Sequence, residues 1–156
     1  MDKKNEAAFW IEKLGLQPHT EGGWYRELWR ADLSIPQSAL PAVYGGPRSA
    51  CSSIYYLLQE GESSTWHRVR SAEIWLWHAG GTLELSFGGG GETPKTTGIR
   101  LLGPKGDEDE VFQAVVEPGI WQGAKIRQGS FVLVSCIVSP GFHWQDFSLP
   151  QEPAGV

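Results

Sequence analysis

The stretch WHRVRSAEIWLWHAGG, residues 66–81, holds two histidines, a glutamate and three tryptophans just before a glycine pair. Side chains of an extended strand alternate between its two faces. His67 and Glu73 therefore share one face with two of the tryptophans, whereas His78 points to the other. If the shared face looks into a barrel, one imidazole, one carboxylate and two indoles line a single cavity.

The chain around this stretch divides into short runs rich in β-branched and aromatic residues, separated by glycine, proline and acidic turns. The predicted strands cover residues 52–58, 73–78, 82–87, 98–102, 111–116 and 130–138. No helical pattern lies between them to provide parallel crossovers, which favours an antiparallel sandwich or small barrel. A short amphipathic helix is predicted over residues 5–14, with Asn5 as its cap and Gly15 as its stop. We therefore expect an all-β protein with a short N-terminal helix.

At 156 residues the chain is long enough for one domain with a real core and short for two. We expect a single domain over residues 1–156. Its expected segments are an N-terminal helix (1–15), an N-terminal arm and loop (16–48), a β-barrel (49–149) and a flexible tail (150–156).

The charge and hydropathy of the chain exclude several classes of partner. The formal net charge is -5, and no block of lysines or arginines could neutralise a run of phosphates, so we expect no nucleic-acid partner. No apolar run approaches the roughly 20 residues that cross a bilayer, and the N-terminus lacks an apolar stretch of signal-peptide length. We therefore expect a cytoplasmic protein without a membrane partner, in which Cys51 and Cys136 are reduced and structural.

Four residues of the central stretch keep the spacing of a known motif. Gly61, His67, Glu73 and Gly80 match the first cupin motif, G-x5-H-x-H-x3-E-x6-G, with Val69 where the second histidine of that motif would stand. The chain thus resembles the cupins. This resemblance implies an antiparallel jelly-roll barrel, also called a double-stranded β-helix.

The second cupin motif, P-x-G-x2-H, is similar to EPGIWQ at residues 117–122, where Gln122 occupies the histidine position. Cupin metals usually sit on three histidines and one glutamate, so the resemblance leaves only His67 and Glu73 of that set. An amide oxygen is a poor substitute for an imidazole. We therefore expect no cofactor, and a weakly held divalent ion on His67, Glu73 and Gln122 at most.

The resemblance extends over nearly the whole chain to one branch, the cupin-5 family (DUF985), whose members are described as sugar epimerase-like. The matching stretches are residues 14–30, 52–58, 66–81, 117–124 and 129–147. The family implies a homodimer with a ligand pocket. Ile74 and Leu76, which are apolar on the face away from the cavity, also predict a covering element, either the N-terminal segment or a second subunit.

The resemblance to metal-free cupin epimerases suggests how such a pocket works. In those enzymes a barrel histidine held by an acidic residue removes the proton next to a sugar carbonyl, and a tyrosine acts as the acid. By this analogy His67 is the base, Glu73 or Asp146 orients it, and Tyr55 or Tyr56 is the acid.

The expected ligand is a small polar metabolite, a sugar or a nucleotide-like molecule. Indoles stack on sugars or bases, and arginines pair with phosphates. The candidate ligand-binding residues are Trp75, Trp77, Trp121, Gln122, Arg26, Arg30 and Arg68. The alternative is that the indoles pack the core and that the arginines form structural salt bridges. Two other functions stay open, a metal-dependent cupin oxygenase and a metabolite-binding module without catalysis.

Overall fold

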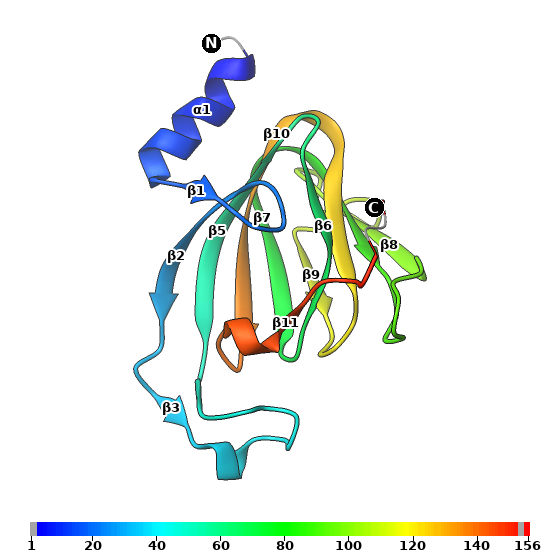
Figure 1. The fold of residues 1–156 in the computed structure, drawn as a ribbon. Helices are drawn as coiled ribbons and strands as arrows, with labels where there is room; N and C mark the ends of the chain where they lie inside the picture. The colour runs from blue at the N-terminus through cyan, green and yellow to red at the C-terminus, as the bar shows by residue number, and fades with distance from the viewer. Residues whose placement is uncertain (1–2, 153–154) are drawn as a thin grey trace.

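The computed structural model describes residues 3–152 and 155–156 (Figure 1). Helix α1 spans Lys3–Leu14, and two 3-10 helices, η1 and η2, span Gln37–Ala39 and Trp144–Asp146. The strands are β1 (Gln17–Pro18), β2 (Trp24–Arg30), β3 (Ser34–Ile35), β4 (Arg48–Ser49), β5 (Ser52–Gln59), β6 (Ser63–Val69), β7 (Ala72–Phe87), β8 (Gly98–Leu102), β9 (Gln113–Val116), β10 (Gln122–Ser139) and β11 (Phe147–Ser148). Within the described residues, no helix has the length and apolar character that a bilayer crossing requires.

The strands form an antiparallel jelly-roll barrel, as predicted. The main sheet has the order β1-β2-β5-β10-β6-β11, and β7 pairs with β10, β8 and β9. The long strands β7 and β10 run side by side, and each bends so that its two halves meet different neighbours. A pocket can therefore open at one end of the barrel, between β2, β5, β6 and β7.

Two details of the predicted elements were wrong. Asn5 lies inside α1 and does not cap it, although Gly15 ends the helix in a left-handed conformation, with φ 63°. The two strands expected at 73–78 and 82–87 are one continuous strand, β7. Its glycine pair does not form a turn, because Gly80 and Gly81 let β7 cross close to β10.

The N-terminal arm contributes to the sheet. Its residues 24–30 form β2, which pairs with β5 and adds a strand to one side of the pocket. The following loop carries β3, which pairs with β4 in a separate two-stranded sheet. The segment expected to be an arm is therefore part of the barrel wall.

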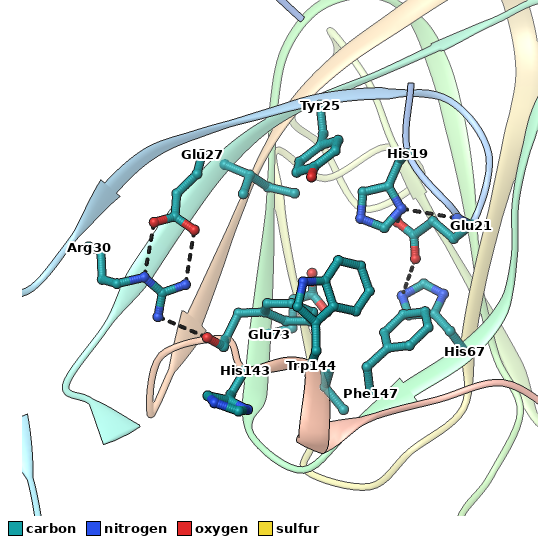
Figure 2. Close-up of a pocket in the computed structure, with 13 residues that line it drawn as sticks. His19, Glu21, Tyr25, Glu27, Arg30, His67, Glu73, His143, Trp144 and Phe147 are labelled. Carbon is teal, nitrogen blue, oxygen red and sulfur yellow. Dashed lines mark hydrogen bonds and ion pairs between the residues drawn. The ribbon is translucent and has the colours of Figure 1, made fainter. Parts of the chain in front are cut away.

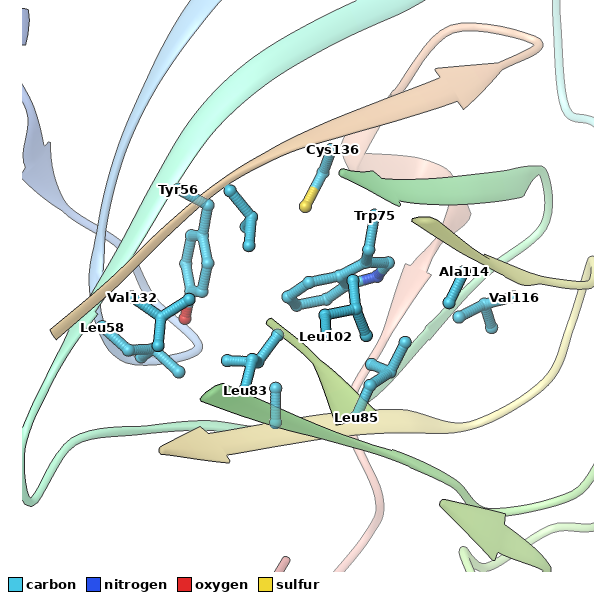
Figure 3. Packing of buried hydrophobic residues seen from close by; sticks show 12 residues of the cluster. Tyr56, Leu58, Trp75, Leu83, Leu85, Leu102, Ala114, Val116, Val132 and Cys136 are labelled. Carbon is cyan, nitrogen blue, oxygen red and sulfur yellow. The ribbon is translucent and has the colours of Figure 1, made fainter. Parts of the chain in front are cut away.

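Two apolar clusters hold the barrel together. The first fills the interior, where the rings of Tyr56 and Trp75 meet edge to face with centroids 5.9 Å apart (Figure 3). The second lies between α1 and the outer face of the sheet, and includes Ala7, Leu57 and Phe131. Full burial of one large apolar side chain contributes about 1.5–3 kcal/mol, so both faces of the sheet at this end contribute to stability.

The end of the chain contacts the barrel. The indole of Trp66 donates a hydrogen bond to the carbonyl of Gly155 over 2.9 Å, and Lys125 donates to Val156 over 3.0 Å. These contacts differ from the flexible tail expected for 150–156, of which 153–154 lie outside the described residues.

The close crossing of β7 over β10 predicts a large difference between two glycines. A Cβ added to Gly81 would lie 1.8 Å from the carbonyl oxygen of Gln128, whereas at Gly98 it would meet nothing within 4 Å. Gly81→Ala is expected to lower the free energy of unfolding by about 2 kcal/mol or more. The control Gly98→Ala should change it by less than about 0.5 kcal/mol. Urea unfolding measures both, and equal effects would contradict the crossing geometry.

Candidate functional site

A pocket of about 250 Å³ opens at one end of the barrel (Figure 2). Its deep part is polar and contains His19, Glu21, His67 and Glu73. Its outer part is mostly aromatic and is built by β2 together with the segment around η2. The barrel thus places a small group of ionisable side chains at the bottom of an apolar opening.

The buried ion pair between His67 and Glu21 dominates the deep part of the pocket. Nε2 of His67 lies 2.9 Å from a carboxylate oxygen of Glu21, and both side chains are buried. The other ring nitrogen, Nδ1, lies 2.8 Å from the carbonyl oxygen of Thr65. A carbonyl only accepts hydrogen bonds, so Nδ1 carries a hydrogen. Both nitrogens of His67 are therefore engaged by the protein, and its orienting acid is Glu21.

The tight turn between β1 and β2 carries Glu21 to His67. The backbone amide of Glu21 donates to Nδ1 of His19 over 3.0 Å, and its carbonyl accepts from the amide of Thr65 over 2.9 Å. At Gly22, which has φ 101°, a Cβ would lie 2.1 Å from the carbonyl oxygen of Ser63. A glycine at this position lets the turn pack directly against β6.

Glu73 is the second carboxylate of the deep part. Its Oε2 accepts a hydrogen bond of 2.6 Å from the amide nitrogen of Gln122, whose oxygen accepts from the indole of Trp75 over 2.8 Å. Gln122 therefore fixes Glu73 and does not point freely into the cavity. The predicted placement of His67 and Glu73 on one face agrees with the structure, since both line the pocket.

Two of the predicted partners of His67 lie elsewhere. Asp146 forms a bidentate ion pair with Arg48, with both bonds at 2.7 Å and both side chains 2% exposed, so it anchors η2 and does not orient His67. Tyr55 packs in the cluster under α1, with its ring 6.1 Å from that of His78, and does not line the pocket. Tyr56 points inward, but its hydroxyl donates to the carbonyl of Gly22.

The three tryptophans predicted to bind ligand do not line this pocket. Trp75 and Trp121 are each 1% exposed. Trp77 packs against the interior cluster, and its indole donates to the carbonyl of Gly81 over 2.9 Å. Core packing, the alternative considered for these indoles, is what the structure contains.

Of the three candidate arginines, one lines the pocket. Arg26 donates to the carbonyl of Leu14, and Arg68 lies over the ring of Trp121 at 4.4 Å, so neither lines the pocket. Arg30 does line it, but makes two bonds of 2.9 Å to Glu27 and one of 2.8 Å to a backbone carbonyl.

Several pocket residues were missed by the sequence reasoning. They come from two segments outside the central stretch: His19, Glu21 and Tyr25 from the N-terminal arm, and Trp144 and Phe147 from the region of η2. Residues 14–30 carry part of the family resemblance, and the sequence predicts an N-terminal arm over most of them. The glycine pair next to Glu21 was the available signal of a tight, functional turn.

Known proteins resemble this chain over most of its length. The family model Cupin_5, described as Cupin superfamily (DUF985), matches residues 8–150. The chain belongs to the Cupin_5 family. One similar structure is a hypothetical protein from Leishmania major, with 34% identity, a TM-score of 0.78, and coverage of 92% of this chain and 86% of that one. Another is a protein from Shewanella oneidensis, with 36% identity, a TM-score of 0.78, and coverage of 92% and 83%.

More distant structures share the cupin fold alone. A conserved protein with a double-stranded β-helix domain from Klebsiella pneumoniae is 13% identical, with a TM-score of 0.58 over 90% of this chain and 94% of that one. No curated protein matches the chain.

Burial and charge change the ionisation of this Cupin_5 pocket. Burial lowers the pKa of His67, but the charge and hydrogen bond of Glu21 outweigh it and raise the pKa to about 9. Burial and repulsion by Glu21 raise the pKa of Glu73 to about 6, against the opposing charge of His67. Burial lowers the pKa of His19. Near neutral pH, His67 is therefore an imidazolium, His19 is neutral, and Glu73 titrates just below neutrality.

The donor set of the Cupin_5 pocket does not fit the metal site of other cupins. Both nitrogens of His67 and both ends of the Gln122 amide already have protein partners, and Val69 offers no donor. Among the described residues, no three His, Cys, Asp or Glu side chains are grouped so that they could hold an ion. A weak ion on His67, Glu73 and Gln122 would have to break these hydrogen bonds.

The ion pair predicts how His67 titrates. Its folded pKa lies above its ordinary value of 6.5, so the pair stabilises the fold fully below about pH 6.5, and this stabilisation is lost as the pH rises through 9. In Glu21→Gln the charge and hydrogen bond that outweigh burial are gone, so the pKa of His67 should fall from about 9. The measurement is a ¹⁵N NMR titration of the imidazole nitrogens. Glu60→Gln, on the exposed surface, is the control and should leave the titration unchanged. A His67 that is neutral at pH 7.5 in the unsubstituted protein would contradict the pair.

Proposed function

We propose that this Cupin_5 protein binds a small polar metabolite in the pocket and transfers a proton at a carbon next to a carbonyl, as an isomerase or epimerase does. The observation that carries the proposal is Glu73, a buried carboxylate that lines the cavity and has a pKa of about 6. A carboxyl group tuned toward neutral pH is suited to general acid-base catalysis.

The proposed roles of His67 and Glu73 are the reverse of those expected from the sequence. His67 has no free nitrogen with which to take a proton, because Glu21 and Thr65 engage both. Glu73 has its Oε2 fixed by Gln122 and accepts the proton in this proposal. The imidazolium of His67 then stabilises negative charge that develops on the substrate. His67 with Glu21 acts electrostatically, and Glu73 acts as the base.

The pocket favours a metabolite without a phosphate group. Among the described lining residues Arg30 is the one arginine, and its bonds to Glu27 and to the carbonyl of Phe142 already use three of its donors. A nucleotide sugar needs cationic partners for its pyrophosphate. We therefore propose an unphosphorylated polar metabolite and do not carry the nucleotide alternative further.

We also propose that the protein is a homodimer. The outer face of the sheet carries Ile74 and Leu76 of β7 between the exposed Trp29 of β2 and Val115 of β9. Among the described residues, helix α1 packs on this face near Leu57, Phe131 and Leu133. Exposed apolar surface of this kind is typical of subunit contacts, and a second copy would cover it.

The dimer proposal predicts the effect of one charge on that face. Trp29→Glu should give a monomer, because dimerisation would bury the new charge without a partner. Leu149→Glu, at an exposed apolar residue directly after β11, is the control and should remain a dimer. Light scattering after gel filtration measures both masses. A monomeric unsubstituted protein would refute this proposal.

The proton-transfer proposal predicts solvent exchange. Unphosphorylated aldoses, ketoses and amino sugars are incubated with the protein in D₂O, and NMR detects deuterium at the carbon next to the carbonyl. The rate should rise as the pH passes 6, where Glu73 ionises, and fall above about 9, where His67 loses its proton. Glu73→Gln should lower the rate by about 100-fold or more, and the exposed control Glu60→Gln should not change it. Binding without exchange would indicate a binding module.

A further inference from the structure

The charges that line the pocket are paired except for one. Glu21 pairs with His67, and Glu27 pairs with Arg30. Glu73 forms no ion pair: its Oε2 accepts from the neutral amide of Gln122, and the nearby charge of His67, which attracts it, is already paired with Glu21. A carboxylate that is 7% exposed is costly to keep ionised without a counter-charge. The pocket is therefore complementary to a ligand that brings a positive charge.

The opening of the pocket is built from aromatic rings. Phe142, Trp144 and Phe147 pack edge to face, with the centroids of Trp144 5.0 Å from Phe142 and 5.3 Å from Phe147. Tyr25 also lines the pocket, from β2, and Trp144 is 52% exposed. Ring faces attract cations, and a carboxylate behind the rings strengthens that attraction.

We propose that the pocket recognises a small organic cation, an alkylated ammonium group held between Tyr25, Trp144 and Phe147 with its charge toward Glu73. This proposal names the class of ligand that the pocket binds. It rests on the proposed function only in that both use the same pocket. The carbons of the ammonium group contact the rings, and the positive charge compensates the one unpaired carboxylate.

Other ligand classes fit these groups less well. A phosphate would meet Glu73 and an arginine already engaged by Glu27. A neutral sugar could stack on the rings but would leave Glu73 without a counter-charge. A positive charge next to a C–H bond also stabilises the carbanion left when the proton is removed, so an ammonium substrate is compatible with Glu73 as the base.

The test compares a cation with an uncharged molecule of the same shape. Choline and 3,3-dimethylbutan-1-ol are titrated into the full-length protein at pH 7.5 by calorimetry, with glucose and inorganic phosphate as competing classes. Choline should bind at least about tenfold more tightly than the alcohol, as expected of a partly desolvated cation on aromatic rings. Binding of glucose or phosphate more tightly than choline would overturn the proposal.

Variants show whether the named side chains are responsible. Glu73→Gln and Trp144→Leu should each weaken choline binding by about tenfold or more, while Glu60→Gln should not change it. Trp144 is half exposed, so its variant keeps the proposal testable if Glu73→Gln does not fold. Unchanged choline affinity in Trp144→Leu would overturn the aromatic part of the site.

A pH series provides a test without any substitution. The titratable groups around Glu73 are His67, Glu21 and Cys136. The other titratable or charged residues that line the pocket are His19, Tyr25, Glu27, Arg30 and His143. Choline affinity should rise between pH 5 and 7.5 as Glu73 ionises. It should do so in His143→Asn as well, since asparagine can keep the cap that His143 provides to η2. Affinity independent of pH would overturn the role of Glu73.

The two proposals fail separately. Choline binding with no deuterium exchange in any substrate would retain the cation site and refute proton transfer. Exchange in a neutral sugar, with no preference for choline over its isostere, would retain proton transfer and refute the cation site.

Discussion

The ion pair between His67 and Glu21 is the interaction on which the site depends. It joins the turn between β1 and β2 to strand β6, and it is buried where water cannot screen it. One buried charge alone would be costly, so each residue makes the ionised form of the other tolerable. The same pair sets the surroundings of Glu73, because Glu21 repels its charge and His67 attracts it.

A second buried ion pair holds the opposite wall. Asp146 and Arg48 fix η2 against β4, and this places Phe147 beside the ring of His67 and Trp144 beside Phe147. Phe147 stacks on His67 with centroids 5.5 Å apart and an angle of 22°. The pocket is thus assembled from three distant parts of the chain: the N-terminal turn and β2, the central strands, and the segment around η2. The buried pair of Glu21 with His67 holds the first of these in place, and the pair of Arg48 with Asp146 holds the last.

The sequence predicted the barrel and one side of the site, for physical reasons that differ from residue to residue. His67 and Glu73 lie on one short stretch, so strand alternation was sufficient to place them on the same face. Glu21 and Trp144 could not be placed this way, because their positions depend on how distant segments pack against β6. Trp75 and Trp121 show a second limit of the sequence pattern. Strand alternation predicts that an indole points inward, but it does not distinguish the wall of a cavity from a filled core.

Gln122 is one of the residues by which this protein differs from cupins that hold metals. It stands where the cupin motif has a histidine, and Val69 stands where another would be. An amide does not ionise near neutral pH, so the charge of Gln122 does not change while it accepts from Trp75 and donates to Glu73. Val69 and Gln122 are thus the two side chains by which this barrel differs from a metal-binding cupin. Gln122 replaces a metal ligand with a side chain that holds Trp75 and Glu73 in place by hydrogen bonds.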